Sequence, residues 1–496
     1  MSDPRLSELL NGIIELPASF DRPVRGLALD SRDVRPGSLF FATRGTQRHG
    51  IEFARAAVDA GAIAVLWDPD PELAPLLDAL TVPVIAVADL GQRLGAIAER
   101  FHGGPSRHLQ VVGVTGTNGK TSVAHFLAQL LDQPPLRCGF IGTLGAGLYG
   151  ELAPGTHTTP DAIQVHRILA DFVTRGAACA AMEVSSHALD QGRVNGVRFE
   201  IGVFTNLTRD HLDYHGDMAR YAAAKRSFFF RHRPRFAVLN ADDPIGRQWL
   251  ESLPTVVEPL AYSLHGPVAG FPTLTVSEWQ LTSQGMQLEI ESPWGRAHVA
   301  SPLLGAFNAS NLLAALGALL LLGKSLPEAA ARLSHVRPPP GRMECLGGGT
   351  LPLVVIDYAH TPDALEKTLQ ALRAHTAGRL ICVFGCGGDR DPGKRPLMGR
   401  SAESYADSGI ITDDNPRGED PAAIARAILQ GQHDTRQMPV IHDRRVAIRA
   451  ALADARAGDT VLIAGKGHES YQIVGRDSRP FSDRAVVTEW LVEVSR

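Results

Sequence analysis

The spacing of apolar residues places one glycine-rich loop between a strand and a helix. Residues 109–112 are apolar and β-branched enough to form a short buried strand. After the loop, apolar residues recur at the spacing of one helix face, at Val123, Phe126, Leu127, Leu130 and Leu131. The loop "GVTGTNGKTS", residues 113–122, therefore leads from the end of a strand into the first turn of a helix.

The same patterning predicts strands and helices in most of the chain. Strand-like runs near the N-terminus are 26–31, 38–42, 62–68 and 82–88, with helical runs at 53–61 and 91–101. Residues 273–301 alternate apolar with polar side chains, which favours antiparallel strands. Toward the C-terminus, strand-like 353–360, 379–388, 408–416 and 460–467 are interleaved with helical 364–374, 422–431 and 447–458. Such alternation is typical of a parallel, doubly wound sheet, whose ligands bind beyond the carboxyl ends of its strands.

Two Gly/Pro-rich joints, 101–108 and 335–349, divide the chain. A chain of 496 residues is too long for one ordinary core. We therefore expect an α/β protein of three domains: a small N-terminal α/β domain (1–107), a central P-loop mononucleotide-binding α/β domain (108–337) and a C-terminal Rossmann-like doubly wound domain (338–496).

Composition narrows the classes of partner. The net charge of -4 provides no general basic field for nucleic acid, so a small molecule is the expected partner. Five cysteines without C-x-x-C spacing indicate neither a disulfide framework nor a zinc site. The N-terminus has no signal-peptide pattern, and the longest apolar stretch, near 311–323, is too short to cross a bilayer. A cytoplasmic monomer with no membrane association is expected.

The glycine-rich loop carries the clearest chemistry. Glycines allow the backbone to wrap around a phosphate, Lys120 can reach terminal phosphoryl oxygens, and the Thr121 hydroxyl can ligate Mg²⁺. The strict P-loop pattern needs a glycine at position 114, where this chain has Val114. Gly-Thr-Asn-Gly alone could be a simple turn. Its place between strand and helix favours a nucleoside triphosphate.

Other polar residues leave two interpretations open. Glu183 and His211 follow apolar strands and could bind Mg²⁺, or could be caps and surface charges. Asn308 and Asn311 open an apolar helix, where they could cap it or read an adenine edge. Lys225 lies on a predicted helix, where an exposed lysine is the usual interpretation, and Arg342 could be a hinge arm or an ion-pair partner.

The motif "DDNPRGED" also has two interpretations. Arg417 buried among Asp413, Asp414 and Asn415 would form a socket for a zwitterion, and a plain acidic turn is the alternative.

Twelve stretches in order resemble the Mur ligase family of bacterial cell-wall synthesis. They include "LDSRDVRPGSLFFA", "GVTGTNGKTS", "MEVSSHAL", "NLTRDHLDYHGDM", "GAFNASN", "GRME", "IDYAHTPDALE", "VFGCGGDRDPGKRPLMG", "DDNPR" and "AGKGHESYQ". "DNPR" is the discriminating motif, because members that add lysine lack its arginine. The resemblance implies an ATP-dependent ligase that adds meso-diaminopimelate to the D-glutamyl γ-carboxylate of a UDP-N-acetylmuramoyl dipeptide through an acyl phosphate.

The resemblance also implies roles for individual residues. ATP would be bound by Thr115, Gly116, Thr117, Asn118, Gly119, Lys120, Thr121, Asn308, Asn311, Arg342 and Asp357. Catalysis and Mg²⁺ binding would involve Lys120, Thr121, Glu183, His211 and a carbamylated Lys225. The UDP substrate would meet Leu29, Ser31, Thr46, Gln47, Arg48, His157, Thr158, Thr159, Ser185, Gln191 and Arg193. Diaminopimelate would meet Arg390, Asp414, Asn415, Pro416, Arg417, Gly465 and Glu469.

Three rivals share parts of this pattern. A lysine-adding ligase and a folylpolyglutamate-type synthetase use the same chemistry. A P-loop switch protein would bind nucleotide without forming an amide. These functions can be told apart by incubating the protein with ATP and each acceptor amino acid in turn, and by measuring the release of phosphate and the formation of the amide product.

Overall fold

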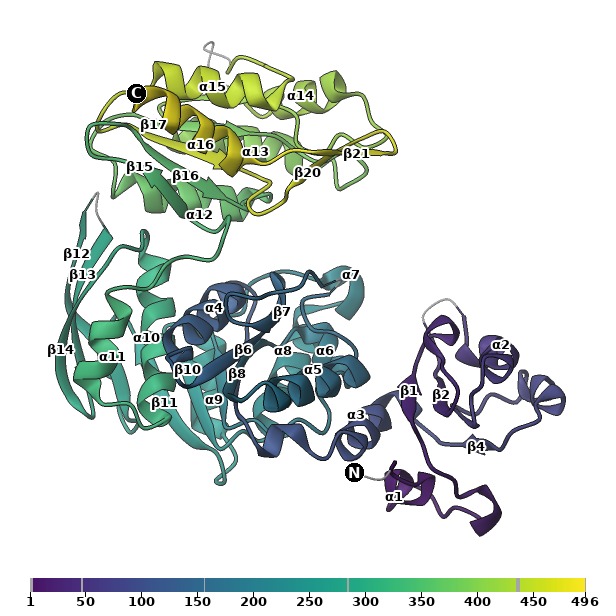
Figure 1. Cartoon of the computed structure of the whole chain (residues 1–496). Coiled ribbons are helices and arrows are strands. Elements are labelled where there is room, and N and C mark those ends of the chain that lie inside the picture. Colours follow the sequence, from purple (N-terminus) through teal and green to yellow (C-terminus); the bar gives the residue numbers. More distant parts are fainter. Residues whose placement is uncertain (1–2, 46–47, 156, 283–284, 434–437, 496) are drawn as a thin grey trace. The chain divides into compact units, whose positions relative to one another are not determined.

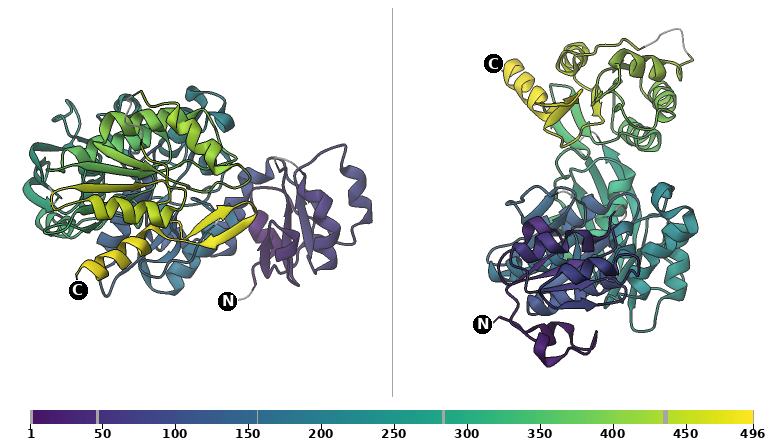
Figure 2. Two further views of the ribbon diagram at one scale, coloured as in Figure 1. Left: turned by 90° about the horizontal axis from the view of Figure 1, so that it is seen from above. Right: turned by 90° about the vertical axis from the view of Figure 1, so that its right-hand side faces the viewer.

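The computed structural model describes residues 3–45, 48–155, 157–282, 285–433 and 438–495. The chain divides into two compact units, and each is described by itself. The first comprises Met1–Leu274 with Leu313–Ser325, and the second Thr275–Leu312 with Leu326–Arg496. Both are built of strands and helices (Figures 1 and 2), which confirms the expected α/β class.

The first unit begins with a four-stranded parallel sheet. Its strands follow the chain order, β1 (Gly26–Ala28), β2 (Ser38–Ala42), β3 (Ala64–Trp67) and β4 (Val84–Ala86). One face packs on α1 (Leu6–Leu10) and α3 (Leu90–Phe101), and the other on α2 (Ala54–Asp59). All four strands, α2 and α3 match the sequence patterns. The five-residue α1 is too short to show a periodicity, and it was not predicted.

A larger sheet forms the rest of the first unit. Neighbouring strands run β11-β10-β9-β5-β8-β6-β7, and only the last pair is antiparallel. The strands are β5 (Gln110–Thr115), β6 (Arg137–Gly142), β7 (Gly145–Leu148), β8 (Ala177–Glu183), β9 (Ile201–Phe204), β10 (Phe236–Asn240) and β11 (Glu258–Ser263). Because β5, β8 and β9 are adjacent and parallel, the loops at their carboxyl ends meet at one edge.

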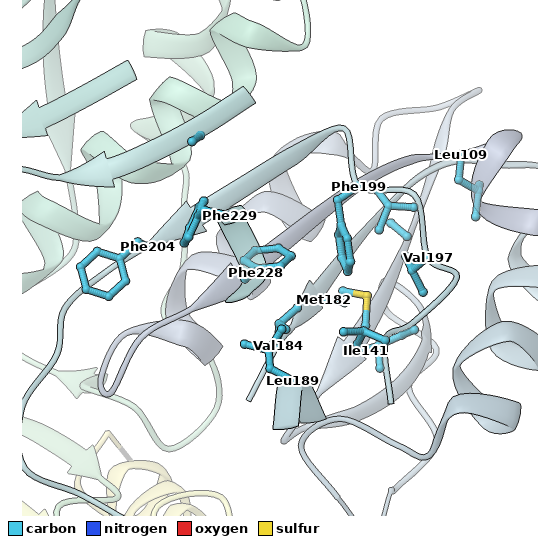
Figure 3. Close-up of a cluster of buried hydrophobic side chains, with 14 of the residues drawn as sticks. Leu109, Ile141, Met182, Val184, Leu189, Val197, Phe199, Phe204, Phe228 and Phe229 are labelled. Carbon is cyan, nitrogen blue, oxygen red and sulfur yellow. The ribbon is translucent and has the colours of Figure 1, made fainter. Parts of the chain in front are cut away.

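Helices cover this sheet and its apolar core. They are α4 (Lys120–Leu131), α5 (Ala162–Thr174), α6 (Ser186–Asp190), α7 (Leu212–His215), α8 (Met218–Phe230) and α9 (Pro244–Ser252). Figure 3 shows part of the core, where Phe228 of α8 lies between Phe229 and Phe199 and close to Met182 of β8. The rings of Phe199 and Phe228 meet edge to face at 4.8 Å. This packing fixes α8 against the sheet.

The second unit contains an antiparallel meander and two helices. β12 (Thr273–Thr282), which begins at the end of the first unit, pairs with β13 (Gly285–Ser292), and β13 pairs with β14 (Gly295–Ser301). The alternation in residues 273–301 predicted this arrangement. Helix α10 (Ala306–Leu321) follows, and its residues from Leu313 onward belong to the first unit. Helix α11 (Leu326–Leu333) belongs to the second unit.

The C-terminal part of the second unit is the expected doubly wound sheet. Its order is β15-β16-β19-β17-β18, parallel except for β15. The strands are β15 (Glu344–Gly347), β16 (Leu353–Asp357), β17 (Leu380–Phe384), β18 (Ser408–Ile411) and β19 (Thr460–Ala464). One face is covered by α12 (Pro362–Arg373), α13 (Lys394–Tyr405) and α14 (Pro421–Leu429), the other by α15 (Arg444–Asp454) and α16 (Asp483–Val494) (Figure 1).

Some elements of this unit were not predicted. They are α11, β15, α13, α16 and the hairpin of β20 (Tyr471–Val474) and β21 (Asp477–Pro480), which is drawn in yellow in Figure 2. The hairpin is polar and largely exposed, so it carries no period-two apolar signal. All five cysteines are unpaired thiols. Among the described residues, no helix combines the length and the hydropathy that a membrane span requires.

Candidate active site

The phosphate loop lies at the end of β5 and opens α4, as its sequence predicts. Gly116 has φ +148, and a Cβ there would lie 1.9 Å from Thr205 Oγ1. Gly119 is left-handed at the N-cap of α4. Thr117 N and Asn118 N donate to the backbone and side-chain oxygens of Asn206, at 2.8 and 2.9 Å. The loop is thus preformed as a glycine cradle at a helix N-terminus, which is the geometry that binds phosphate.

Thr115 and Lys120 border this cradle. Thr115 Oγ1 is buried and has no hydrogen-bond partner among the described residues, so it is available to a ligand. Lys120 Nζ donates to the carbonyl oxygens of Gly116 and Thr117, each at 2.9 Å. Its ammonium group therefore lies directly over the loop.

Glu183 is the last residue of β8, and its carboxylate is fully buried beside the first turn of α4. Thr121 Oγ1 donates to Glu183 Oε2 at 2.9 Å, and Thr143 N donates to Oε1 at 2.7 Å. The surface-charge interpretation of Glu183 is therefore wrong. A hydroxyl and a carboxylate side by side are hard oxygen donors of the kind that Mg²⁺ prefers.

Lys225 on α8 is not the exposed lysine that its helical position suggested. Its side chain is 1% exposed, and Nζ donates to Gly116 O at 2.7 Å. Burial, helped by the charge of Lys120, lowers the pKa of Lys225 well below its ordinary value. The Tyr221 ring lies 4.7 Å from Nζ. A buried amine with a depressed pKa, next to the phosphate loop, is a candidate for chemistry.

His211 stands at the N-cap of α7 with φ +52. Its Nε2 lies 3.4 Å from Asp210 Oδ2, and its ring is 4.9 Å from that of His187. Burial lowers the pKa of His211, and Lys120 and Lys225 contribute, while Asp210 opposes the shift. Among the residues that the structure describes, no three His, Cys, Asp or Glu side chains form a ready-made metal cage.

Five residues predicted for the UDP substrate form one network that adjoins Glu183. Thr159 Oγ1 donates to Glu183 O at 2.8 Å and Arg193 Nη1 donates to Thr159 O at 2.8 Å. The remaining contacts are Thr158 with Thr143 at 3.0 Å, Thr159 with Ser185 at 3.4 Å, and Arg193 with Gln191 at 2.9 Å.

The other predicted UDP residues are more dispersed. Leu29 packs partly buried on the N-terminal core, and Ser31 begins a short 3-10 turn. Arg48 Nη2 donates to Glu52 Oε2 at 2.6 Å, and His157 is exposed. Thr46 and Gln47 lie outside the described residues.

In the second unit, Asn308 and Asn311 are buried within α10, so neither is its N-cap and the capping interpretation is wrong. Asn308 Nδ2 donates to Leu304 O at 2.8 Å, and Asn311 Nδ2 to Asn308 Oδ1 at 3.1 Å.

Arg342 and Asp357 lie in the same unit. The Arg342 guanidinium stacks 4.6 Å from the Tyr358 ring. Asp357 accepts from Met343 N and Ala359 N, each at 2.8 Å, and burial raises its pKa although Arg342 opposes the shift.

The "DNPR" loop follows β18 and faces the turn after β19. Gly465 has φ +114, and a Cβ there would lie 2.5 Å from Asp414 Oδ2. Arg417 corrects the sequence-based picture, because it is half-buried rather than buried among carboxylates. Its Nη1 donates to Gly388 O at 2.9 Å and Asn415 O at 3.5 Å. The position of the Arg417 guanidinium therefore depends on the loop that contains Gly388, a contact that the sequence pattern did not predict.

That neighbouring loop, residues 387–391, carries Arg390. Gly388 N donates to Asn415 O at 2.9 Å, and Gly418 N donates to Asp389 Oδ2 at 3.0 Å. Glu419 Oε1 accepts from Asp389 N at 2.5 Å and from Arg395 Nη2 at 2.8 Å. The two loops are thus tied together by hydrogen bonds in both directions, which fixes Arg390 relative to Arg417.

Replacing Glu419 by alanine should loosen this connection. We expect the Asp389 amide to exchange with solvent about tenfold faster, because a hydrogen bond to a charged group is lost at a partly exposed position. Native-state hydrogen exchange measures the change. Glu489→Ala, on the exposed face of α16, is the control. An unchanged Asp389 rate would show that Glu419 does not hold the loop.

Three family descriptions match the chain. "Mur ligase family, catalytic domain" matches residues 23–102, "Mur ligase middle domain" matches 114–319, and "Mur ligase, glutamate ligase domain" matches 341–467. They follow one another in the order of the three expected domains.

Full-length relatives share the same name. A protein of Alkalilimnicola ehrlichii called UDP-N-acetylmuramoyl-L-alanyl-D-glutamate--2,6-diaminopimelate ligase is 53% identical over 496 residues, covering 99% of each chain. A protein of the same name from Pseudomonas aeruginosa is 50% identical over 466 residues, covering 94% of each. A solved structure with that name has a TM-score of 0.77 and 37% identity, covering 100% of both chains.

Proposed function

The chain belongs to the Mur ligase family, and from that premise we infer that it is the ATP-dependent ligase that adds diaminopimelate to UDP-N-acetylmuramoyl-L-alanyl-D-glutamate. The observation that carries the inference is the 53% identity over 99% of both chains to a ligase of that name. The α/β fold, the three Mur ligase domain matches in order and the preformed phosphate loop agree with it. The individual site residues below are proposals.

The first half of the reaction activates a carboxylate. Direct attack of an amine would require oxide to leave, so the D-glutamyl γ-carboxylate instead attacks the γ-phosphorus of ATP, and ADP leaves. Thr115, residues 116–119 of the loop and Lys120 hold the triphosphate, and Lys120 faces the charge that develops on the transferred group. Thr158, Thr159, Ser185, Gln191 and Arg193 hold the muramoyl dipeptide beside this loop.

Mg²⁺ fits the oxygen donors of the first unit. Thr121 Oγ1 and Glu183 Oε2 lie 2.9 Å apart, and His211 and a carbamylated Lys225 complete the proposed set. When bound, the ion disperses negative charge on the phosphates. Asn308 and Asn311 are proposed for adenine, and Arg342 and Asp357 for the ribose and phosphates.

The second half of the reaction forms the amide. The free amine of diaminopimelate attacks the carbonyl carbon of the acyl phosphate, phosphate leaves with the C–O bonding electrons, and the amine loses a proton. Arg390, Asp414, Asn415, Pro416, Arg417, Gly465 and Glu469 hold the acceptor, whose distal carboxylate and ammonium need both signs of charge. Leu29, Ser31 and residues 46–48 are proposed for the uridine diphosphate, with His157 near the dipeptide.

Lys225 is proposed to carry a carbamate. Its uncharged amine attacks CO₂, forms an N–C bond and releases a proton, and the product is a carboxylate-like group. The lowered pKa of Lys225 supports this reaction, because only the neutral amine is nucleophilic. Protein equilibrated with ¹³C-bicarbonate should show a carbamate carbon signal that Lys225→Met removes. A signal unchanged in Lys225→Met, or none in the unsubstituted protein, would contradict the proposal.

One assay tests the function against its rivals. The protein is incubated with ATP, the UDP-muramoyl dipeptide and either diaminopimelate or lysine, and inorganic phosphate and amide product are measured together. We expect both products with diaminopimelate. Product with lysine instead indicates the lysine-adding ligase, and ATP hydrolysis without amide indicates a nucleotide switch.

We further propose that the enzyme acts as a monomer in the cytoplasm, where five unpaired thiols are stable.

A further inference from the structure

Lys466 is a buried lysine next to the acceptor residues. It follows β19 in the turn 465–469, and its side chain is 0% exposed. Its Nζ donates to Asn415 Oδ1 and to Glu469 Oε2, each at 3.1 Å. Burying an ammonium group is costly unless it is paired and hydrogen-bonded. Lys466 therefore has a defined pair of partners, and both belong to the proposed acceptor site.

These bonds decide which way the Asn415 amide points. An ammonium group can only donate, so Asn415 must present Oδ1 to Lys466. Oδ1 also accepts from Ile473 N at 2.9 Å. The amide nitrogen then faces Glu469, and Nδ2 donates to Oε2 at 3.0 Å. With the opposite amide orientation, Asn415 and Glu469 would set two acceptors against each other.

The same bonds fix the Glu469 carboxylate. Its Oε2 accepts from both Asn415 and Lys466, whereas Oε1 has no hydrogen-bond partner among the described residues. The carboxylate is only 17% exposed, so it has little water to replace its partners. One oxygen is anchored, and the other is left for a ligand donor.

We propose that Lys466 is a positioning residue: it orients Asn415 and Glu469 so that Glu469 Oε1 accepts a hydrogen bond from an ammonium group of the acceptor amino acid. This inference rests on the proposed function. Lys466 is expected to affect the binding of the acceptor amino acid and to leave the binding of ATP at the phosphate loop unchanged.

The test separates acceptor binding from the chemical step. With ATP and the UDP-muramoyl dipeptide saturating, Lys466→Met should raise KM for diaminopimelate about tenfold or more, because hydrogen bonds to a charged group lose their geometry. The kcat value should stay within about threefold. Lys367→Met, a surface lysine of α12 paired with Asp363, is the matched control and should leave KM unchanged.

A double-substitution cycle shows whether Lys466 acts through Glu469. In a Glu469→Gln background, adding Lys466→Met should change KM by less than about threefold, because the residue it positions is already altered. Lys466→Gln, which retains an N–H donor, is measured in the same two backgrounds in case the methionine variant does not fold. An unchanged KM in the single variants, or the same factor in both backgrounds, overturns the inference.

The activity of the unsubstituted enzyme shows whether the proposed function fails or only the proposed role of Lys466. If it forms no amide with diaminopimelate, the proposed function fails. If it turns over diaminopimelate while the Lys466 variants keep its KM, only the role of Lys466 fails.

Discussion

Substituting Lys120 by alanine is expected to lower kcat by about 10³-fold while binding of the UDP substrate survives. Lys120 Nζ lies over the phosphate loop, 2.9 Å from two of its carbonyl oxygens. The substitution removes a positive charge from the place where the transferred phosphoryl group gains negative charge. Charge that develops only in the transition state affects kcat more than ground-state binding.

The measurement pairs phosphate release with calorimetric binding of the UDP-muramoyl dipeptide. Lys367→Ala, on the surface of α12, controls for the loss of a lysine from the chain. Retained ligase activity in Lys120→Ala would refute the assigned role. Loss of dipeptide binding together with activity would indicate that the loop itself had collapsed.

Arg417→Ala is expected to reduce the preference for diaminopimelate over lysine by about 10- to 100-fold. The two acceptors differ by one distal carboxylate. In the described structure only Nη1 of Arg417 has hydrogen-bond acceptors, Gly388 O and Asn415 O. Nε and Nη2 therefore remain for a carboxylate, in the fork geometry that guanidinium provides.

The ratio of kcat/KM values for diaminopimelate and lysine tests this expectation. Arg426→Ala, an exposed arginine of α14, is the control and should keep the ratio of the unsubstituted enzyme. An unchanged ratio in Arg417→Ala would mean that selectivity arises elsewhere in the acceptor site. A fall in kcat/KM for both amino acids alike would indicate a general loss of binding rather than of selectivity.

Local patterns were sufficient wherever neighbours in sequence are neighbours in space. The phosphate loop follows from its strand, its glycines and the apolar face of α4, all within 109–131. The four parallel strands of the doubly wound sheet follow from β-branched runs, and the meander from the alternation in 273–301. The polar hairpin, the short helix α1 and the weakly amphipathic helices α13 and α16 escaped prediction, because their apolar repeats are too short or too weak to recognise.

Only the tertiary structure decided what surrounds a charged side chain. The sequence shows Lys225 as one more helical lysine, and its burial depends on the phosphate loop 109 residues away. Lys466 had no predicted role, and its partners come from a turn and from a loop 51 residues earlier. The physical reason is that dielectric environment and hydrogen-bond geometry are set by segments distant in sequence, whereas secondary structure is set by residues a few positions apart.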